Sequence, residues 1–266
     1  MVGCKTKKGL LPKDKSNQHG KLVKDSISVM IPYLANLEQI RARVQHTLET
    51  GVQIDLSTEE CKKYLRRHVN SKIKIAVLYI DIIGSTNMNQ VLPASKLALM
   101  LQVFSQEMTM VSNAYGGYVL KYVGDAVITL FPADYDPHQT CENAINCAKS
   151  MLAILKECIN PPLKAMSLPE INVNISIDVG EVLVVLYGKS IKSHIDIIGL
   201  CISIAAKMLS QAPGKNQIII GQSAYSLVRK YKAPEENFAF KALAVDISQW
   251  PYKDLETGEA YSLYTV

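Results

Sequence analysis

Apolar residues recur along the chain with two different periods, which predict an alternation of strands and helices. Residues 74–82 form a continuous apolar run, typical of a buried strand. Residues 93–114 carry apolar side chains at helical spacing, and Pro93 suits the start of a helix. By the same criteria, strands are predicted at 117–123, 126–132, 172–179, 182–187 and 216–220, and helices at 137–158, 198–211 and 221–230.

The order of these elements predicts the fold class. Gly124-Asp125 is expected to turn the chain between two strands, and Gly180-Glu181 is expected to turn it between the next two. Residues 237–266 are expected to form a final hairpin. The core order is βαββαβ, the ferredoxin-like split arrangement, so we expect an α+β fold.

The chain before the first strand divides into a tail and a helical extension. Residues 1–24 hold seven lysines and one acidic residue, a composition typical of a solvated tail. Residues 25–72 form a helical N-terminal extension, leaving 73–266 as the main domain. Its longer helix, expected over 25–50 with a bend at Pro32, carries an apolar stripe. The stripe fits a dimer seam or packing onto the domain, and its short length favours packing.

A second, shorter helix is expected to begin at Ser57. Glu60 follows three residues later, which is the spacing of a capping box.

Charge and cysteine content narrow the class of protein. The formal net charge of +5 comes largely from the tail, so the near-neutral remainder gives little support for a nucleic-acid partner. Six cysteines without C-x-x-C spacing indicate reduced thiols rather than a disulfide framework or a zinc site. No apolar run is long enough to span a bilayer, and we expect a soluble, cytoplasmic protein.

Two aspartates interrupt the apolar pattern at the ends of predicted strands. Asp81 follows Tyr79-Ile80, and Asp125 follows Gly124 in the first predicted bend. A carboxylate on a buried strand is costly to desolvate unless it is paired or binds a metal. A split βαββαβ order brings the two positions to the same end of the sheet, so they predict a divalent-cation site.

The residues after the first aspartate suit phosphate binding. Gly84, Ser85 and Thr86 offer backbone N–H groups and hydroxyls where the chain enters the next helix. Taken singly, Asp81 and Asp125 are also compatible with ordinary capping or turn residues.

Three segments, 80–86, 121–126 and 195–199, resemble the successive motifs of the class III nucleotidyl cyclases. The resemblance covers roughly residues 73–266 in order and spacing. It implies a ferredoxin-like domain that dimerises head to tail and holds a nucleotide between two subunits. The implied reaction is attack of the ribose 3′-hydroxyl on the α-phosphate, which releases pyrophosphate and a cyclic nucleotide.

The resemblance also assigns roles. Asp81 and Asp125 match the ligands of two Mg²⁺ or Mn²⁺ ions, and the carbonyl of Ile82 would complete one metal shell. Lys121 and Asp196 match the pair that reads the base. A lysine that donates to adenine N1 and an aspartate that accepts from its amino group favour ATP over GTP. From the sequence alone, the less favoured alternative for Lys121 is a solvated lysine at the end of a strand.

Other positions depart from the family pattern. Ser203 and Lys207 stand where active cyclases usually carry an asparagine and an arginine for the ribose and the α-phosphate. Glu181 stands where some members place a phosphate-binding arginine, and Val185 replaces a usual glycine. Lys241 is the candidate for contact with the terminal phosphates. Because lysine lacks the planar donor fork of arginine, the pattern predicts better binding than turnover.

Two hypotheses follow. The first is a homodimeric, metal-dependent adenylyl cyclase of low turnover, with Ser203 and Lys207 as its catalytic residues. The second is a catalytically silent cyclase-homology domain that binds a nucleotide or a partner and signals through residues 25–70.

Overall fold

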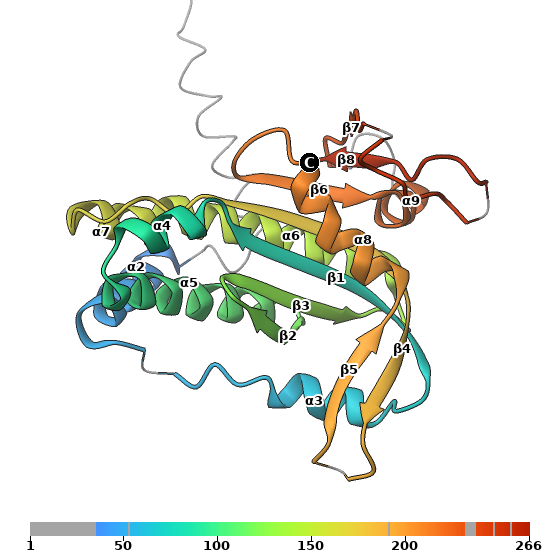
Figure 1. The fold of residues 1–266 in the computed structure, drawn as a ribbon, viewed down its shortest axis with the longest axis horizontal. Helices are drawn as coiled ribbons and strands as arrows, with labels where there is room; N and C mark the ends of the chain where they lie inside the picture. Colours follow the sequence, from blue (N-terminus) through green and yellow to red (C-terminus); the bar gives the residue numbers. More distant parts are fainter. Residues whose placement is uncertain (1–35, 53, 191, 232–237, 247, 256) are drawn as a thin grey trace, which may run out of the picture.

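One sheet runs through the described part of the chain (Figure 1), which comprises residues 36–266 of the computed structural model without 53, 191, 232–237, 247 and 256. The predicted tail and Pro32 lie outside this part. From one edge to the other, the strands are β2 (Tyr118–Val123), β3 (Ala126–Pro132), β1 (Lys72–Ile82), β4 (Val173–Tyr187), β6 (Gln217–Gly221), β8 (Leu263–Thr265) and β7 (Lys241–Leu243), and β5 (His194–Ile198) pairs with β4 outside this order.

The first four strands have the ferredoxin-like arrangement. Helix α5 (Ala94–Ala114) connects β1 to β2, and α6 (Pro137–Ile154) leads from β3 toward β4. The spatial order β2-β3-β1-β4 is antiparallel throughout. This confirms the α+β fold predicted from the order of apolar runs.

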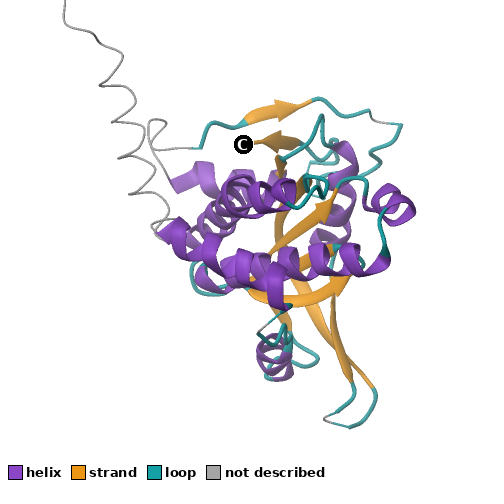
Figure 2. Ribbon diagram, turned by 90° about the vertical axis from the view of Figure 1, so that its left-hand side faces the viewer, coloured by secondary structure: helices purple, strands orange, loops and turns teal. Residues whose placement is uncertain are grey.

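Most helices form one layer against the sheet, whereas α3 lies apart from them at the bottom of the views in Figures 1 and 2. Further elements are α2 (Leu37–Thr50), α3 (Glu59–Arg66), α4 (Ser85–Val91), a π-helical turn (Leu155–Ile159), α7 (Asn160–Ala165), α8 (Leu200–Met208), a 3-10 turn (Leu209–Gln211) and α9 (Gln222–Tyr231).

Strand β1 separates two apolar cores, as its alternating side chains require. Leu78 and Ile80 face the main core, which includes residues of α2, α5 and α6. Val77 and Tyr79 face a second core, which includes residues of α3, β5 and α8. Asp81 shares the second face with Tyr79, because the two positions are two residues apart on the strand.

The predicted bend at Gly180-Glu181 is wrong. The two strands expected on either side of it form the single long strand β4. Gly180 serves close packing instead, because a Cβ atom there would lie 3.0 Å from the Cβ of Cys201. The actual partner of the second half of β4 is β5, which the apolar pattern did not reveal.

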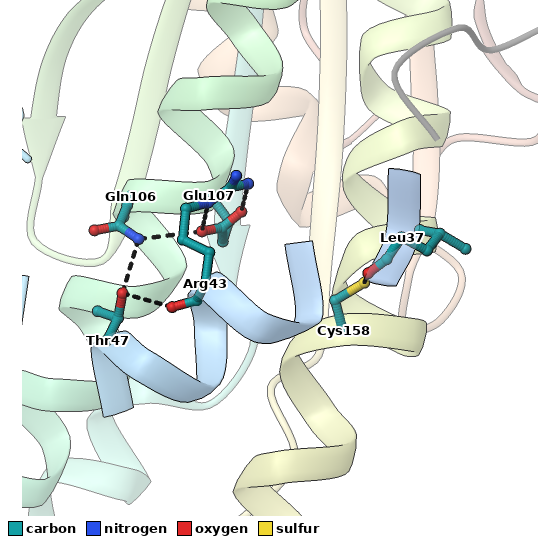
Figure 3. A network of polar contacts seen from close by, with 6 residues as sticks. All are labelled: Leu37, Arg43, Thr47, Gln106, Glu107 and Cys158. Atoms are coloured by element: carbon teal, nitrogen blue, oxygen red, sulfur yellow. Dashed lines mark hydrogen bonds and ion pairs between the residues drawn. The ribbon is translucent and has the colours of Figure 1, made fainter. Parts of the chain in front are cut away.

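The N-terminal helix α2 packs onto the domain, as its apolar stripe favoured. Val44 is fully buried in the main core. Beside it, Arg43 makes a two-pronged ion pair with the buried Glu107 of α5, with Nε–Oε1 2.9 Å and Nη2–Oε2 2.6 Å. Figure 3 shows the adjoining hydrogen bond of 3.0 Å from Gln106 to Thr47.

Helix α3 begins two residues after its predicted start. The Ser57 hydroxyl accepts the Glu59 N–H at 3.1 Å, but Glu60 does not complete a capping box, since its carboxylate pairs with Lys63 at 2.6 Å. The five cysteines in the described residues are free and buried, in agreement with the predicted reduced thiols. Among the helices described here, none has the length and hydropathy needed to cross a membrane.

Candidate functional site

The two predicted acidic residues lie at the same end of the sheet. Ile80 of β1 pairs with Val127 of β3, so Asp81 follows directly beside the turn that joins β2 to β3. Asp125 occupies that turn, next to Gly124 in the left-handed region with φ 64°. Sheet register and a tight turn therefore bring the two carboxylates together.

Asp81 and Asp125, here called the acid pair, lie close together and repel each other. Burial, and then the nearby charge of Asp125, raise the pKa of Asp81 to about 6, against a hydrogen bond from the Ile82 backbone. Oδ2 of Asp125 is buried and has no hydrogen-bond partner among the described residues. Both observations fit a cation between the carboxylates, since a bound cation supplies the missing countercharge.

The two carboxylates suit a hard cation that also coordinates water or substrate oxygens. Within the described residues, no group of three or more His, Cys, Asp and Glu side chains could hold a metal ion. Magnesium is commonly held by one or two carboxylates together with water and substrate phosphates. The acid pair matches that pattern.

Lys121 and Asp196 form the second predicted pair. Nζ of Lys121 donates to Oδ2 of Asp196 at 2.6 Å, and the Ile197 N–H donates to Oδ1 at 2.9 Å. The two side chains are 40% and 21% exposed, so a ligand can reach them. The structure therefore places these residues together, although they lie on β2 and β5.

Two neighbours of Asp196 were missed in the sequence. His194 lies two residues earlier on β5, with Nε2 3.9 Å from Oδ2 of Asp196. Burial, and then the charge of Asp196, raise the pKa of Tyr79 to about 12. The alternation of side chains along a strand could have identified both residues. His194 lies on the same face of its strand as Asp196, and Tyr79 lies on the same face of its strand as Asp81.

The remaining predicted site residues lie on or beside β1, α4 and α8, and Ile82 is buried at the end of β1. Gly84 has φ 77° and directly precedes α4, which begins with a half-buried Ser85 and an exposed Thr86. Ser203 and Lys207 lie on the exposed side of α8. Neither takes part in the acid pair or in the Lys121–Asp196 pair.

Comparison with known proteins defines the family. The family described as "Adenylate and Guanylate cyclase catalytic domain" matches residues 68–247, more than half of the chain. The chain belongs to this family. The predicted class III cyclase resemblance is thereby confirmed.

Curated cyclases with different stated substrates are similar in sequence. A cytidylate cyclase from Escherichia coli is 31% identical over 157 residues, covering 56% of this chain and 34% of that protein. An adenylate cyclase from Anabaena cylindrica is 25% identical over 202 residues, covering 73% and 36%. The chain thus spans about a third of the length of these relatives.

Solved cyclase structures share the fold. The guanylyl cyclase Cya2 has a TM-score of 0.61 at 18% identity, covering 74% of this chain and 93% of that one. The adenylyl cyclase CyaB from P. aeruginosa has a TM-score of 0.60 at 21% identity, covering 74% and 94%.

The structure shows what surrounds Glu181 and Val185, which depart from the family pattern, and Lys241, the candidate for phosphate contact. Glu181 pairs with Lys72 at 3.5 Å on the exposed surface, and Val185 lies opposite Asp196 on the neighbouring strand. Lys241 lies on β7, at the opposite edge of the sheet from β2. By contrast Lys253, from the loop between β7 and β8, lines a pocket of about 490 Å³ together with Glu181.

Proposed function

We propose that this cyclase domain converts ATP to cyclic AMP and pyrophosphate, with low turnover, at the interface of a head-to-tail homodimer. The observation that carries the proposal is that one chain presents both a cation-deficient acid pair and a Lys121–Asp196 pair suited to a base. The first suits a metal-bound polyphosphate, and the second suits the edge of a nucleobase.

The carboxylates of Asp81 and Asp125 and the carbonyl of Ile82 would hold the divalent cations. Cations bound there lower the pKa of a coordinated hydroxyl and neutralise phosphate charge. Ser85 and Thr86 follow the first acid in the sequence and would add hydroxyls for phosphate oxygens. Lys241, or Lys253 from the pocket that also includes Glu181, would contact the terminal phosphates. Ser203 would orient the ribose, while Lys207 would stabilise charge on the α-phosphate.

The Lys121–Asp196 pair supports adenine over guanine. A lysine donates to adenine N1, and an aspartate accepts from the N6 amino group, whereas guanine presents O6 and N1–H in the reverse order. Cytosine presents an acceptor and an amino group in the same order as adenine. The hydrogen bonds of these two residues therefore cannot distinguish ATP from CTP, and only the size of the base can. CTP is the competing nucleotide to test.

Exposed apolar residues support a second copy as the partner. Leu183 and Ile198 are neighbours across β4 and β5, and they are 42% and 56% exposed. Leu200, which starts α8, is 45% exposed near the side of the helix that carries Ser203 and Lys207. A head-to-tail copy would cover this surface and bring Lys207 to the acid pair of its partner.

The exposed Ser203 and Lys207 also favour a second candidate function. A domain without the usual asparagine and arginine could bind a nucleotide and signal without catalysis. Losing one transition-state donor costs roughly 3–4 kcal/mol, or about 10²–10³ in rate. A lysine that keeps its charge reduces that loss.

The test is direct. The purified full chain is incubated with Mn²⁺ and each of ATP, CTP, GTP and UTP, and the cyclic products are separated and measured. We expect cyclic AMP above the level of an Asp81→Ala control, whereas the exposed-acid variant Glu170→Gln should match the wild type. Absence of any cyclic product at high protein concentration would reject the enzyme and leave the silent domain. Cyclic CMP as the main product would reject ATP as the substrate.

A further inference from the structure

Helix α3 lies outside the family match yet packs against both strands that carry the Lys121–Asp196 pair. The family match begins at residue 68, two residues after α3 ends at Arg66. The helix contacts β2 and β5, and Figure 1 shows it below β2 and beside β5. It is therefore an element of this chain whose role the family match leaves open.

The buried side of α3 lies against the surroundings of Asp196. Cys61 and Leu65 are 2% and 0% exposed and belong to the second core, together with Ile195 and Ile197 on either side of Asp196. Burial, and then the negative charge of Asp196, raise the pKa of the Cys61 thiol to about 12. The charge of the carboxylate that would read the base therefore acts on a side chain of α3.

Each strand also receives one directed contact from α3. The ring of Tyr64 stacks on that of Tyr118, the first residue of β2, with 5.6 Å between centroids. Nη2 of Arg66 donates to the carbonyl of Ser193, the residue before β5, at 3.2 Å. The helix consequently bridges the two strands.

Backbone pairing alone leaves the spacing of these strands loosely defined. Strand β2 is at one edge of the sheet, and three strands (β3, β1 and β4) separate it from β5. Strand β5 pairs with β4 outside the main order. Helix α3, which packs against both β2 and β5, therefore links the two strands by a short route that does not depend on the bond between Lys121 and Asp196.

We propose that α3 sets the distance between Lys121 and Asp196, and that Arg66 is a positioning residue for base selection. Arg66 anchors the residue before β5, and Cys61 and Leu65 share the second core with Ile195 and Ile197 of that strand. This inference rests on the proposed nucleotide site, because it assigns how that site distinguishes one base from another.

The test compares Arg66→Ala with the neighbouring Arg67→Ala, which removes the same charge from an exposed position. With the full chain and all four nucleotides, Arg66→Ala should raise KM for the preferred nucleotide about tenfold, the effect of losing one charged hydrogen bond. Its preference for that nucleotide over GTP should fall, with a smaller change in kcat. Arg66→Lys, which keeps a donor, should recover part of the preference. An Arg66→Ala variant with unchanged preference would overturn the inference and leave the proposed function intact.

Two further measurements separate the inference from the proposed function. Hydrogen exchange without nucleotide should be faster at the amides of residues 194–198 in Arg66→Ala than in Arg67→Ala, and equal rates would overturn the anchoring role. If the wild type binds nucleotides but forms no cyclic product, the proposed function fails, and the ratio of the ATP and GTP dissociation constants replaces KM. If the wild type binds no nucleotide, both proposals are rejected.

Discussion

The acid pair and the Lys121–Asp196 pair present opposite electrostatic situations in one domain. Asp81 and Asp125 repel each other, and an oxygen of Asp125 is buried without a partner among the described residues. Lys121 and Asp196 neutralise each other at 2.6 Å. In the proposed nucleotide site, a cation would complete the first pair, whereas a base would have to separate the members of the second. Metal binding should therefore stabilise the fold, whereas base binding must compete with an existing contact.

The largest expected effect comes from removing one charge of the acid pair. Asp81→Asn keeps the shape of the side chain but eliminates the repulsion, so the metal-free variant should melt at a higher temperature than the wild type. Cyclic product should fall by at least about 10²-fold, in line with the loss of a transition-state group. Thermal melts with EDTA and with Mn²⁺ check the difference, because Mn²⁺ should stabilise the wild type alone. A similar Mn²⁺ shift in both proteins would contradict metal binding by the pair.

A second test restores the usual family residues on α8. The double variant Ser203→Asn with Lys207→Arg should raise product formation by up to about 10²-fold, because arginine offers a planar donor fork for the α-phosphate. Initial rates with ATP and Mn²⁺ measure the change. Lys164→Arg, which makes the same exchange at an exposed lysine of α7, is the control. If the double variant loses existing activity, Ser203 and Lys207 serve catalysis as they stand.

A third test breaks the Lys121–Asp196 pair. Lys121→Met should lower kcat/KM for ATP about tenfold and reduce the preference for ATP over GTP, because adenine N1 loses its donor. The free energy of unfolding should change by less than about 1 kcal/mol, since partly exposed ion pairs contribute little to stability. Denaturant titration and kinetics with both nucleotides measure the two effects. A large loss of stability with unchanged preference would make the pair structural.

The smallest expected effect concerns Asp178, a buried carboxylate that differs from both pairs. Tyr261 donates to it at 2.8 Å, yet burial still raises its pKa to about 7. The folded pKa lies above the unfolded one, so the folded state holds the proton more tightly and stability falls as pH rises from about 4 to 7. The slope for one group is at most about 1.4 kcal/mol per pH unit. Asp178→Asn should flatten this fall, as urea titrations across that range would show, and an unchanged slope would contradict it.

Much of this fold could be predicted because long apolar runs determine its central strands. The convergence of Asp81 and Asp125 also followed from strand order, since adjacent antiparallel strands bring their ends together. Gly180 shows where such reasoning fails. A glycine needed for close approach to Cys201 has the same sequence appearance as a glycine needed for a turn.

The surroundings of Asp196 were harder to predict for a related reason. Strand β5 has only five residues and pairs with β4 alone, so it leaves a weak periodic signal. The bond from Arg66 of α3 to Ser193, the residue before β5, joins residues 127 positions apart. Local pattern contains no information on such a contact. The roles of the site residues remain predictions for the experiments above.

The ion pair between Arg43 and Glu107 has a consequence for where this domain can be cut. Glu107 is fully buried, and Arg43 is the cation that reaches both of its oxygens. A shortened protein that starts at residue 68, where the family match begins, would leave that carboxylate facing the gap left by α2. The same deletion would remove Ile40, Val44 and Leu48 from the main core, and burying an apolar side chain of this size contributes roughly 1.5–3 kcal/mol. The family match places the start of the domain at residue 68, whereas stable folding requires α2. Recombinant fragments should therefore begin before Leu37.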